Sequence, residues 1–345
     1  MKEKTLLRID RDRLAKQAPT AESADAGNTS HRPPESKVPH TPTWSRWPKQ
    51  GPASQPVWTD STRRMEIMRS ISCPDSAPIS RLISKHDVIV SCGDDGYVRK
   101  ISSVDLSVSE IIGRHTAFAS GSAWINSDKM LTSAGDGEIK IWDIHTFESE
   151  RWSFHHSCVW SLDVLGHYAL TGCMDHTAKL IDINRGKCRH TLRVHVDSIN
   201  RAVFLDQTSA LTASADKSVS LWDIRTSNCI STSFVHRSVV SDVAACAHLV
   251  ISSDLAGHVA VSDIRRGLSL PLKTYQLGHG SVNCVLWLGR DSFLAGCKDG
   301  SVVQLFSDER SIDRLEMSQQ GPILSMTRVE SEIITSSSKE LTTWS

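Results

Sequence analysis

Five histidines recur at nearly constant intervals, and histidine is the side chain best suited to acid–base chemistry near neutral pH. They are His115, His156, His195, His236 and His279, separated by 41, 39, 41 and 43 residues. About 20 residues after four of them stands an aspartate, at Asp136, Asp175, Asp216 and Asp299. An imidazole beside a carboxylate can serve as an acid–base pair. Because an active site is not copied four times in one chain, the repetition favours a structural hydrogen-bond network instead.

Motifs for enzymatic or metal chemistry are missing from the sequence. It contains no GxxxxGK[ST], HExxH or GxSxG segment. The neighbouring His155, His156 and Cys158 do not have the spacing of a recognised metal site. Nine cysteines include no CxxC pair, and Cys188 and Cys229 each lie seven residues before a histidine, as expected of thiols in a repeated packing position. We therefore predict no enzymatic activity, no cofactor and no metal.

The composition points to proteins as partners. The 345 residues carry a formal net charge of zero, so no electrostatic attraction to nucleic acid or to an anionic membrane is predicted. Mean hydropathy is −0.24, and no apolar stretch is long enough to cross a bilayer. The first 17 residues lack the apolar core of a signal peptide. We expect a cytoplasmic protein without a small-molecule substrate.

The elements that carry the histidines follow one pattern, which predicts short strands. After His195 come two alternating apolar runs, 199–204 and 210–214, a turn at Asp216-Lys217, and a third run that ends at the pair Trp222-Asp223. Trp142-Asp143 is a second pair of this kind. A repeat of about 40 residues with a Trp-Asp pair is typical of the four-stranded blade of a WD-repeat β-propeller. The fold class is thus all-β.

Seven repeats can be counted from residue 63 onward. Their first strands are expected near Pro78, Phe118, Val159, Ile199, Val239, Val282 and Ile323. The last repeat has only three strands before the chain ends, so residues 64–72 are expected to supply its fourth and to close the ring. Residues 63–345 are therefore predicted to form one seven-bladed propeller.

Residues 1–62 have a different composition from the repeats. They hold eight of the twelve prolines and few β-branched residues, which predicts a disordered tail. Leu6, Leu7, Ile9 and Leu14 favour a short helix over residues 2–17. Trp44 and Trp47 lie in a proline-rich segment, where they either anchor a partner or pack on the propeller itself.

Two sets of residues emerge as candidates for a role in the repeats. The predicted structural network consists of His115, Asp136, Trp142, His156, Asp175, His195, Asp216, Trp222, His279 and Asp299. The residues expected to face partners are Trp160, Asn200, Val240 and Asn283, together with Trp44 and Trp47. Trp160 is alternatively expected to pack against the next blade.

Three blades are expected to lack the full network and to be softer. Blade one has Ile101 in the tryptophan position, blade five has Ala256 and blade seven has Ser338 in the aspartate position. Ser76 and Gln320 stand where blades one and seven would have a histidine.

Several off-consensus segments resemble one family in particular, a WD-repeat protein of the axonemal central apparatus, of the sperm-associated antigen sixteen type. The similarity extends over nearly all of residues 77–345. It is densest in residues 87–96, 158–161, 175–192, 197–200 and 212–229, and in the ending Thr342-Thr-Trp-Ser345. Members of that family have a long coiled coil before the propeller, for which residues 2–17 are the only counterpart here.

The resemblance implies a non-enzymatic scaffold of the central pair in motile cilia or flagella. Its expected partners are other central-apparatus proteins and, through them, microtubules of the cytoskeleton, and its expected location is the axoneme. The alternative is a substrate receptor of a cullin-type ubiquitin ligase or another cytoplasmic WD-repeat adaptor. Arg225 and Arg265, each two residues after an aspartate at the end of a third strand, resemble the adaptor-docking arginine of such receptors.

Overall fold

The computed structural model describes residues 67–72, 77–86, 88–289, 292–307, 317–330, 332–338 and 340–344. The expectations for the tail, including the helix at residues 2–17 and the two tryptophans Trp44 and Trp47, lie outside the described residues, as does Ser76. No helix long and apolar enough to span a bilayer occurs in the part that is described.

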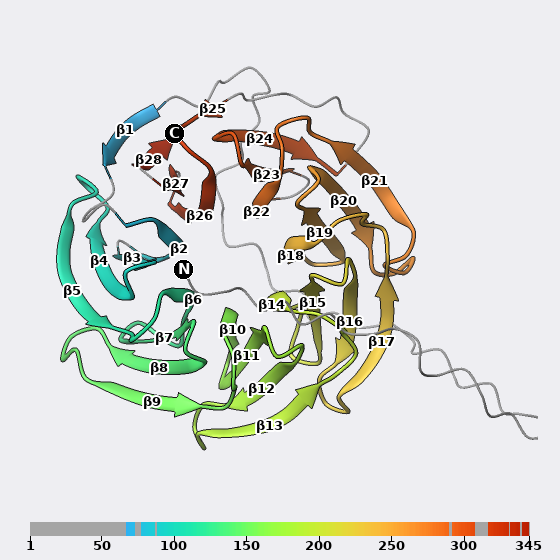
Figure 1. Cartoon of the computed structure of the whole chain (residues 1–345), viewed down its shortest axis with the longest axis horizontal. Coiled ribbons are helices and arrows are strands. Elements are labelled where there is room, and N and C mark those ends of the chain that lie inside the picture. The colour runs from blue at the N-terminus through green and yellow to red at the C-terminus, as the bar shows by residue number, and fades with distance from the viewer. Residues whose placement is uncertain are drawn as a thin grey trace, which may run out of the picture. The chain divides into compact units, whose positions relative to one another are not determined.

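Seven antiparallel four-stranded sheets surround a central channel, and this confirms the predicted seven-bladed, all-β propeller (Figure 1). We number the blades 1 to 7 by their innermost strands. These strands are β2 (Ile79–Lys85), β6 (Ala119–Trp124), β10 (Val159–Leu165), β14 (Ile199–Phe204), β18 (Val240–Cys246), β22 (Val282–Gly289) and β26 (Ile323–Val329). Each innermost strand contacts the innermost strands of both neighbouring blades, and β26 contacts β2. The ring is thereby complete.

The other strands continue each sheet outward from the channel. The second strands are β3 (Val88–Gly93), β7 (Lys129–Ala134), β11 (Tyr168–Cys173), β15 (Ser209–Ser214), β19 (Leu249–Asp254), β23 (Ser292–Cys297) and β27 (Glu332–Ser337). The third strands are β4 (Tyr97–Ser102), β8 (Glu138–Asp143), β12 (Ala178–Asp182), β16 (Val219–Asp223), β20 (His258–Asp263), β24 (Ser301–Phe306) and β28 (Glu340–Trp344). The outermost strands are β5 (Val108–Arg114), β9 (Ser149–Ser153), β13 (Lys187–Leu192), β17 (Asn228–Ser233), β21 (Pro271–Gln276), β25 (Met317–Ser318) and, for blade 7, β1 (Ile67–Ser72).

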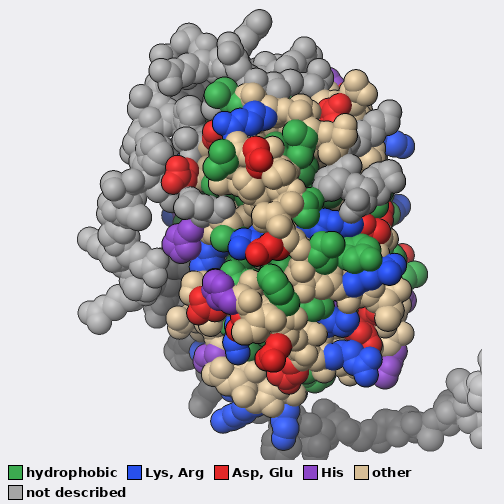
Figure 2. Space-filling view, turned by 90° about the vertical axis from the view of Figure 1, so that its left-hand side faces the viewer, with side chains coloured by type: hydrophobic (Ala, Val, Ile, Leu, Met, Phe, Trp, Pro, Cys, Tyr) green, Lys and Arg blue, Asp and Glu red, His purple; other side chains and the backbone are tan. Residues whose placement is uncertain are grey.

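Burial falls from the inside of each sheet to its outer edge. Every residue of β15 and of β19 is buried, and both strands contain small serine, alanine or threonine side chains that let neighbouring sheets approach closely. In β9 most residues are exposed, and in β13 half of them are. On the side of the ring that Figure 2 shows, acidic and basic side chains are interspersed with apolar ones, in agreement with the net charge of zero.

Apolar clusters between neighbouring blades hold the ring together. There are seven such clusters among the described residues, one for each interface between blades. In the cluster between blades 1 and 2, Trp142 packs with Val90, Cys92 and Ile112. Burying large side chains of this kind stabilises a fold by about 2 kcal/mol each. A single blade lacks half of each cluster, so the repeat is stable only as an array.

The two ends of the propeller meet in one sheet. Strand β28 lies between β27 and β1, with Ile71 opposite Leu341 in the antiparallel register. The Ser70 hydroxyl lies 3.1 Å from the Thr342 hydroxyl and 3.3 Å from a Glu340 carboxylate oxygen. The side chain of Ser336 also donates a hydrogen bond of 3.0 Å to the Ile79 carbonyl in blade 1. Blade 7 therefore takes its outermost strand from the beginning of the propeller and is hydrogen-bonded to blade 1.

Tight turns join the second and third strands of each blade. The backbone N–H of Gly96 donates to the Gly93 carbonyl at 3.0 Å, and Gly96 has a φ of 81°, which favours glycine. Asp95 accepts a hydrogen bond of 3.0 Å from the Tyr97 N–H and forms an ion pair with Arg99. The segment Asp94-Asp95-Gly96 is therefore a hairpin turn.

Candidate functional site

Blade 4 has the complete hydrogen-bond network. The Trp222 indole on β16 donates to the Thr212 hydroxyl on β15 at 2.8 Å. That hydroxyl lies 2.7 Å from Nε2 of His195, and Nδ1 of His195 lies 2.8 Å from the Asp216 carboxylate in the turn. Because a carboxylate only accepts, Nδ1 must donate to Asp216 and Nε2 must accept from Thr212. Every donor and acceptor in this buried chain is therefore matched.

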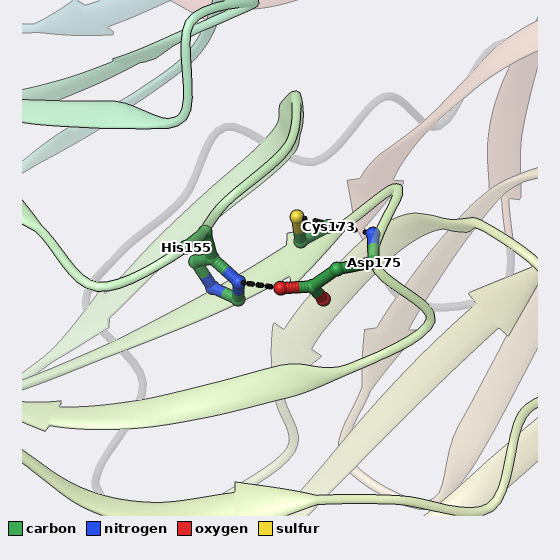
Figure 3. Close-up of side chains that lie close together, drawn as sticks. All are labelled: His155, Cys173 and Asp175. Carbon is green, nitrogen blue, oxygen red and sulfur yellow. Dashed lines mark hydrogen bonds and ion pairs between the residues drawn. The ribbon is translucent and has the colours of Figure 1, made fainter.

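In blade 3, the histidine of the network is His155 and not His156, so the prediction for His156 is wrong (Figure 3). Nδ1 of His155 lies 2.8 Å from Asp175, and its Nε2 lies 2.7 Å from the Thr171 hydroxyl. His156 is exposed. In blades 2, 4 and 5, the histidine lies four residues before the first strand, and only His155 satisfies this spacing in blade 3. The number of residues between a histidine and the strand that follows it is thus the sequence signal that identifies the histidine of the network.

The prediction that blade 5 lacks the full network holds only for its tryptophan, whose place Ser262 takes, and is wrong for its histidine and aspartate. His236 places Nδ1 3.2 Å from Asp254 and Nε2 2.7 Å from the Ser252 hydroxyl. Asp254 ends the second strand β19, two residues before Ala256, where the aspartate was expected. Its carboxylate still reaches the imidazole and accepts from the backbone N–H groups of Ala256 and His258. The position of an aspartate along the chain therefore predicts its contact with the histidine less well than the distance between the two side chains in the structure does.

Blade 2 lacks the predicted pair of His115 and Asp136. Nε2 of His115 lies 2.7 Å from the Thr132 hydroxyl, to which Trp142 also donates, but Nδ1 is buried with no hydrogen-bond partner among the described residues. Asp136 accepts from the Thr116 hydroxyl instead. Burial and the nearby charge of Lys140 lower the pKa of His115 to about 4. The ring is therefore neutral at physiological pH.

The network changes in blades 6 and 7. Nδ1 of His279 lies 2.7 Å from Asp299, as predicted, but Ala295 occupies the place of the threonine. In blade 7, the buried Gln319 replaces the histidine, whereas Gln320, the predicted substitute, is exposed. The Thr335 hydroxyl donates to Oε1 of Gln319 at 2.6 Å and accepts from the Trp344 indole at 2.9 Å. Nε2 of Gln319 donates to the Glu340 carbonyl at 2.8 Å. An amide thus performs both hydrogen-bonding functions of the imidazole.

The protonation states are those of a structural network. Burial lowers the pKa of His155, His195 and His236, and this outweighs the opposite effect of their aspartates. Burial acts to raise the pKa of Asp175, but hydrogen bonds from Thr177 and His155 outweigh it and bring this pKa to about 2. Neutral imidazoles and ionised carboxylates therefore coexist at neutral pH, with their hydrogen bonds directed at each other.

Two groups of side chains have the composition of a metal site. The ligand atoms of His155, Cys173 and Asp175 lie within 4.8 Å of one another, as do those of His115, Asp136 and Glu138. In the first group, burial raises the pKa of the Cys173 thiol to about 12, whereas a metal needs the thiolate. Its sulfur accepts from the Asp175 N–H at 3.3 Å (Figure 3). The sulfur also donates to the Ser157 carbonyl at 3.4 Å. Hydrogen bonds within the protein already use the ligand atoms of His155, Cys173 and Asp175.

Three of the residues predicted to face partners contribute to the ring itself. Val240 is fully buried, because it begins the innermost strand of blade 5 and packs against blade 4. The Asn200 side chain donates to the Val240 carbonyl at 2.8 Å, and that of Asn283 donates to the Ile323 carbonyl at 2.9 Å. The prediction for Val240 as a partner-facing residue is therefore wrong, whereas Asn200 and Asn283 are half-buried and bond to the neighbouring blade.

Asn200 and Asn283 occupy the same position in their blades, which is the second residue of the innermost strand. The side chain at this position donates to the first carbonyl of the next blade's innermost strand, and we call the resulting set of bonds the inter-blade relay. Its donors are Ser80, Ser120, Asn200, Ser241 and Asn283. In blade 7, Leu324 has this position, and Ser336 donates to the Ile79 carbonyl instead.

Blade 3 departs from the relay, because the same position is Trp160. Its side chain is 38% exposed, and its ring lies 5.6 Å from that of Phe118 in blade 2. Trp160 thus faces solvent on one side and packs on the preceding blade, not on the next one as the alternative expected. The absence of a side chain at Gly135 lets the Phe118 ring lie close to the backbone, since a Cβ atom there would approach the ring to 2.5 Å.

Further exposed apolar side chains lie at the same end of the ring as Trp160. The histidines lie in the segments before the innermost strands, and the aspartates lie in the turns after the second strands. Because these side chains bond to each other, both kinds of segment lie at the same end of the ring. We call it the histidine face. Its other exposed apolar residues are Met174, Val194, Val196, Phe234 and Leu255. Sequence reasoning missed them, although apolar residues at turns were a usable signal.

The two arginines that resemble an adaptor-docking feature lie at the opposite end of the ring. The third strand β16 begins at the histidine face, so Arg225, which follows it, is at the other end. The guanidinium group of Arg225 forms two hydrogen bonds with Asp223, of 3.1 and 2.8 Å, and that of Arg265 binds Asp263 in the same way. Both arginine side chains are more than half exposed.

Comparison with known proteins agrees with this architecture. The repeat described as "WD domain, G-beta repeat" matches residues 108–143, 186–223 and 270–304. The chain is 33% identical over 113 residues to pre-mRNA-processing factor 19 of Caenorhabditis elegans, which is 32% of this chain and 23% of that protein. It is 30% identical over 128 residues to the sterol regulatory element-binding protein cleavage-activating protein of Xenopus laevis, covering 37% and 10% of the two chains. The matched segments span less than a quarter of these relatives.

A solved structure supports the fold independently of sequence. The crystal structure of the WD40 beta propeller domain of Doa1 superimposes with a TM-score of 0.73 at 22% sequence identity, covering 81% of this chain and 96% of that one. Together with the three matched repeats and the closed ring of seven sheets, this similarity shows that the chain has the fold of a WD-repeat β-propeller.

Proposed function

We propose that the histidine face binds a partner protein and that Trp160 is the centre of the contact. WD-repeat propellers are in general non-enzymatic interaction scaffolds. The observation that carries the proposal is the substitution within the inter-blade relay: five blades use this position to bond to a neighbour, whereas blade 3 presents a half-exposed indole. Exposed tryptophan is enriched among the residues that dominate binding energy at protein interfaces.

The surroundings of Trp160 support a binding surface. Phe118 supports one side of the indole, so binding would not have to immobilise a flexible side chain. Met174, Val194 and Val196 are exposed in the same blade or just after it. Apolar side chains concentrated on one end of a soluble protein typically mark an interaction site.

The biological setting that we propose is the central apparatus of motile cilia and flagella. The partners would be central-apparatus proteins, through which the propeller is connected to microtubules of the axonemal cytoskeleton. The support for this setting is the resemblance of residues 77–345 to the WD-repeat protein of that apparatus. A scaffold role also agrees with the structural function of the histidine network.

Trp160→Ser tests the binding surface, because serine is the residue that Ser80, Ser120 and Ser241 have in the relay. We expect the variant to melt at or above the temperature of the wild type, since serine can donate to the next blade. In ciliated cells, we expect tagged wild-type protein to remain in detergent-extracted axonemes, and the variant to be lost from them. Thr226→Ser, on an exposed loop at the opposite end, serves as the control.

Two results would contradict the proposal. If the wild-type protein is fully extracted by detergent, the axonemal setting is wrong. If the Trp160→Ser variant is retained like the wild type, Trp160 is not the contact. The two results are independent, because the first concerns location and the second concerns the surface.

A second candidate function is supported by the paired arginines. Arg225 and Arg265 present exposed, oriented guanidinium groups from adjacent blades at the opposite end of the ring, as a ligase adaptor would need. If the chain is a substrate receptor, Arg225→Ala should abolish co-purification with the adaptor of a cullin-type ligase, and Trp160→Ser should leave it intact. No binding of the adaptor by the wild type would exclude this candidate.

A further inference from the structure

A cavity of about 240 Å³ opens among the innermost strands of the ring. Five blades contribute to it: Arg81 in blade 1, Arg201 in blade 4, Asp242 in blade 5, Trp287 in blade 6 and Met326 in blade 7. A volume of this size accommodates a small molecule or one large side chain. The histidine network does not contribute to its lining.

Three nitrogen donors that belong to residues lining the cavity have no hydrogen-bond partner among the described residues. They are Nε of Arg81, Nε of Arg201 and Nε1 of Trp287, and all three atoms are buried. Nε of Arg201 lies 3.2 Å from a carboxylate oxygen of Asp242 in an ion pair, but without hydrogen-bond geometry. A buried donor without an acceptor costs about 1–3 kcal/mol. Because all three groups are donors, the chemistry they lack is that of an acceptor.

The nearby carboxylates bond chiefly to the backbone. Asp242 accepts from the Val243 and Val285 N–H groups, each at 2.9 Å, and the second bond crosses to blade 6. Asp163 accepts from the Val164 N–H at 2.9 Å and from the Phe204 N–H of blade 4 at 2.7 Å. These aspartates therefore fasten neighbouring blades together and leave Arg81 unpaired.

The balance of charge limits the ligand to one negative charge. Arg81 and Arg201 are two cations, and burial with the nearby Arg201 lowers the pKa of Arg81 only to about 10, so it stays charged. Asp242 and Asp163 offset them, and burial raises the pKa of Asp163. The surplus positive charge is thus at most one. A multiply charged phosphate would be repelled by these carboxylates, whereas a monoanion would not.

We infer that this cavity binds a carboxylate that is attached to an apolar group. Arginine binds a carboxylate through its planar array of donors, and Arg81 has that array unused. Ala244, Leu286 and Met326 line the remainder of the cavity and provide contacts for an apolar body. Two sources have this chemistry: a small organic acid, and the carboxyl terminus of a peptide that ends in an apolar residue. The inference does not depend on the partner-binding role of the histidine face.

Phenylacetate and its neutral counterpart 2-phenylethanol are suitable probes, titrated into the full chain by calorimetry. We expect saturable binding of phenylacetate and at least tenfold weaker binding of 2-phenylethanol. Arg81→Met, which removes the charge but keeps an extended apolar side chain, should weaken phenylacetate binding at least tenfold. Arg266→Met, on an exposed loop, is the matched control and should bind like the wild type. Thermal melting establishes that both variants are folded.

A pair of pentapeptides separates the two sources. Each ends in phenylalanine, one with a free carboxyl terminus and one amidated. Tighter binding of the free peptide than of phenylacetate identifies a protein terminus as the ligand, and the reverse order identifies a small acid. If neither the peptide nor phenylacetate binds saturably, or if a folded Arg81→Met variant binds them as the wild type does, the inference is wrong. Trp160→Ser should not affect these measurements, so they fail or succeed independently of the proposed function.

Discussion

At the scale of single residues, the hydrogen-bond network depends on the order of donors and acceptors and not on residue type. An imidazole in blades 3, 4 and 5 and an amide in blade 7 accept from a hydroxyl at the same place. The hydroxyl belongs to threonine in three of these blades and to serine in blade 5. What is required is a group that accepts from the hydroxyl on one side and donates on the other.

Replacing Thr212 by valine removes the hydroxyl from the network of blade 4 without changing the size of the side chain. Nε2 of His195 and the Trp222 indole N–H both lose their partner in a buried environment. We expect the free energy of unfolding to fall by about 3 kcal/mol. Urea unfolding at neutral pH measures this, with Thr226→Val on an exposed loop as control. If Thr212→Val and Thr226→Val lower the free energy of unfolding equally, the network does not stabilise the fold.

The buried histidines make stability depend on pH. The pKa of His115 falls from 6.5 to about 4 on folding, so between these values the unfolded chain binds a proton that the folded chain does not. Stability is therefore fully present above pH 6.5 and is lost as the pH falls toward 4. The contribution of His115 is about 3 kcal/mol. His155, His195 and His236 act in the same direction.

His115→Gln tests this dependence, since Gln319 shows that glutamine can accept from the hydroxyl. Between pH 6 and pH 4.5, the free energy of unfolding of the variant should change less steeply than that of the wild type, by about 1.4 kcal/mol per pH unit. The measurement is urea unfolding across this range. A slope that the substitution leaves unchanged would show that His115 is protonated in the folded protein.

At the scale of strands and sheets, the inter-blade relay complements the apolar clusters. The clusters are non-directional and permit neighbouring blades to slide, whereas a side chain that donates to the next blade's first carbonyl fixes their register. The second residue of the innermost strand bonds to the next blade in five blades, in blade 7 it is Leu324 and Ser336 donates instead, and only in blade 3 is it an exposed aromatic residue. The exception is what makes Trp160 informative.

Asn200→Ala removes one bond of the relay and should lower the free energy of unfolding by about 1 kcal/mol. Asn200→Ser should lose less, because serine makes the same bond in blades 1, 2 and 5. Urea unfolding of the two variants beside the wild type provides the comparison. An equal loss for serine and alanine would mean that Asn200 contributes through packing alone.

At the scale of the whole molecule, closure of the ring depends on a strand from the beginning of the propeller. Without β1, the backbone groups of β28 would be exposed at an unpaired edge, and Ile71 would be lost from the cluster between blades 7 and 1. Unpaired edges also promote association between molecules. Closure therefore contributes both to stability and to solubility.

A chain that begins at Pro74 lacks β1 and should melt at least about 5 °C below a chain that begins at Thr62 and keeps it. The shortened chain should also associate at high concentration, which light scattering measures. Identical melting temperatures would show that blade 7 is stable with three strands.

The sequence by itself determined the repeat, the all-β class, the number of blades and two of the histidine–aspartate pairs, His195–Asp216 and His279–Asp299. These features follow from local patterns: alternation of apolar residues, turn chemistry and a period of about 40 residues. The spacing from histidine to the next strand would also have corrected His156 to His155. The tertiary structure alone decided which polar groups meet, as with His236 and Asp254, or His115 and its unpaired nitrogen.

Only the ring explained why Asn200 and Asn283 are structural while Trp160 is exposed, and only the ring brought Arg81, Arg201 and Trp287 to one cavity. The reason is physical. A repeat pattern specifies each blade from its own residues, but the surface and the channel form between blades, where residues about 40 or more positions apart come into contact. Their positions depend on how the blades are arranged around the closed ring, and no local pattern encodes that arrangement.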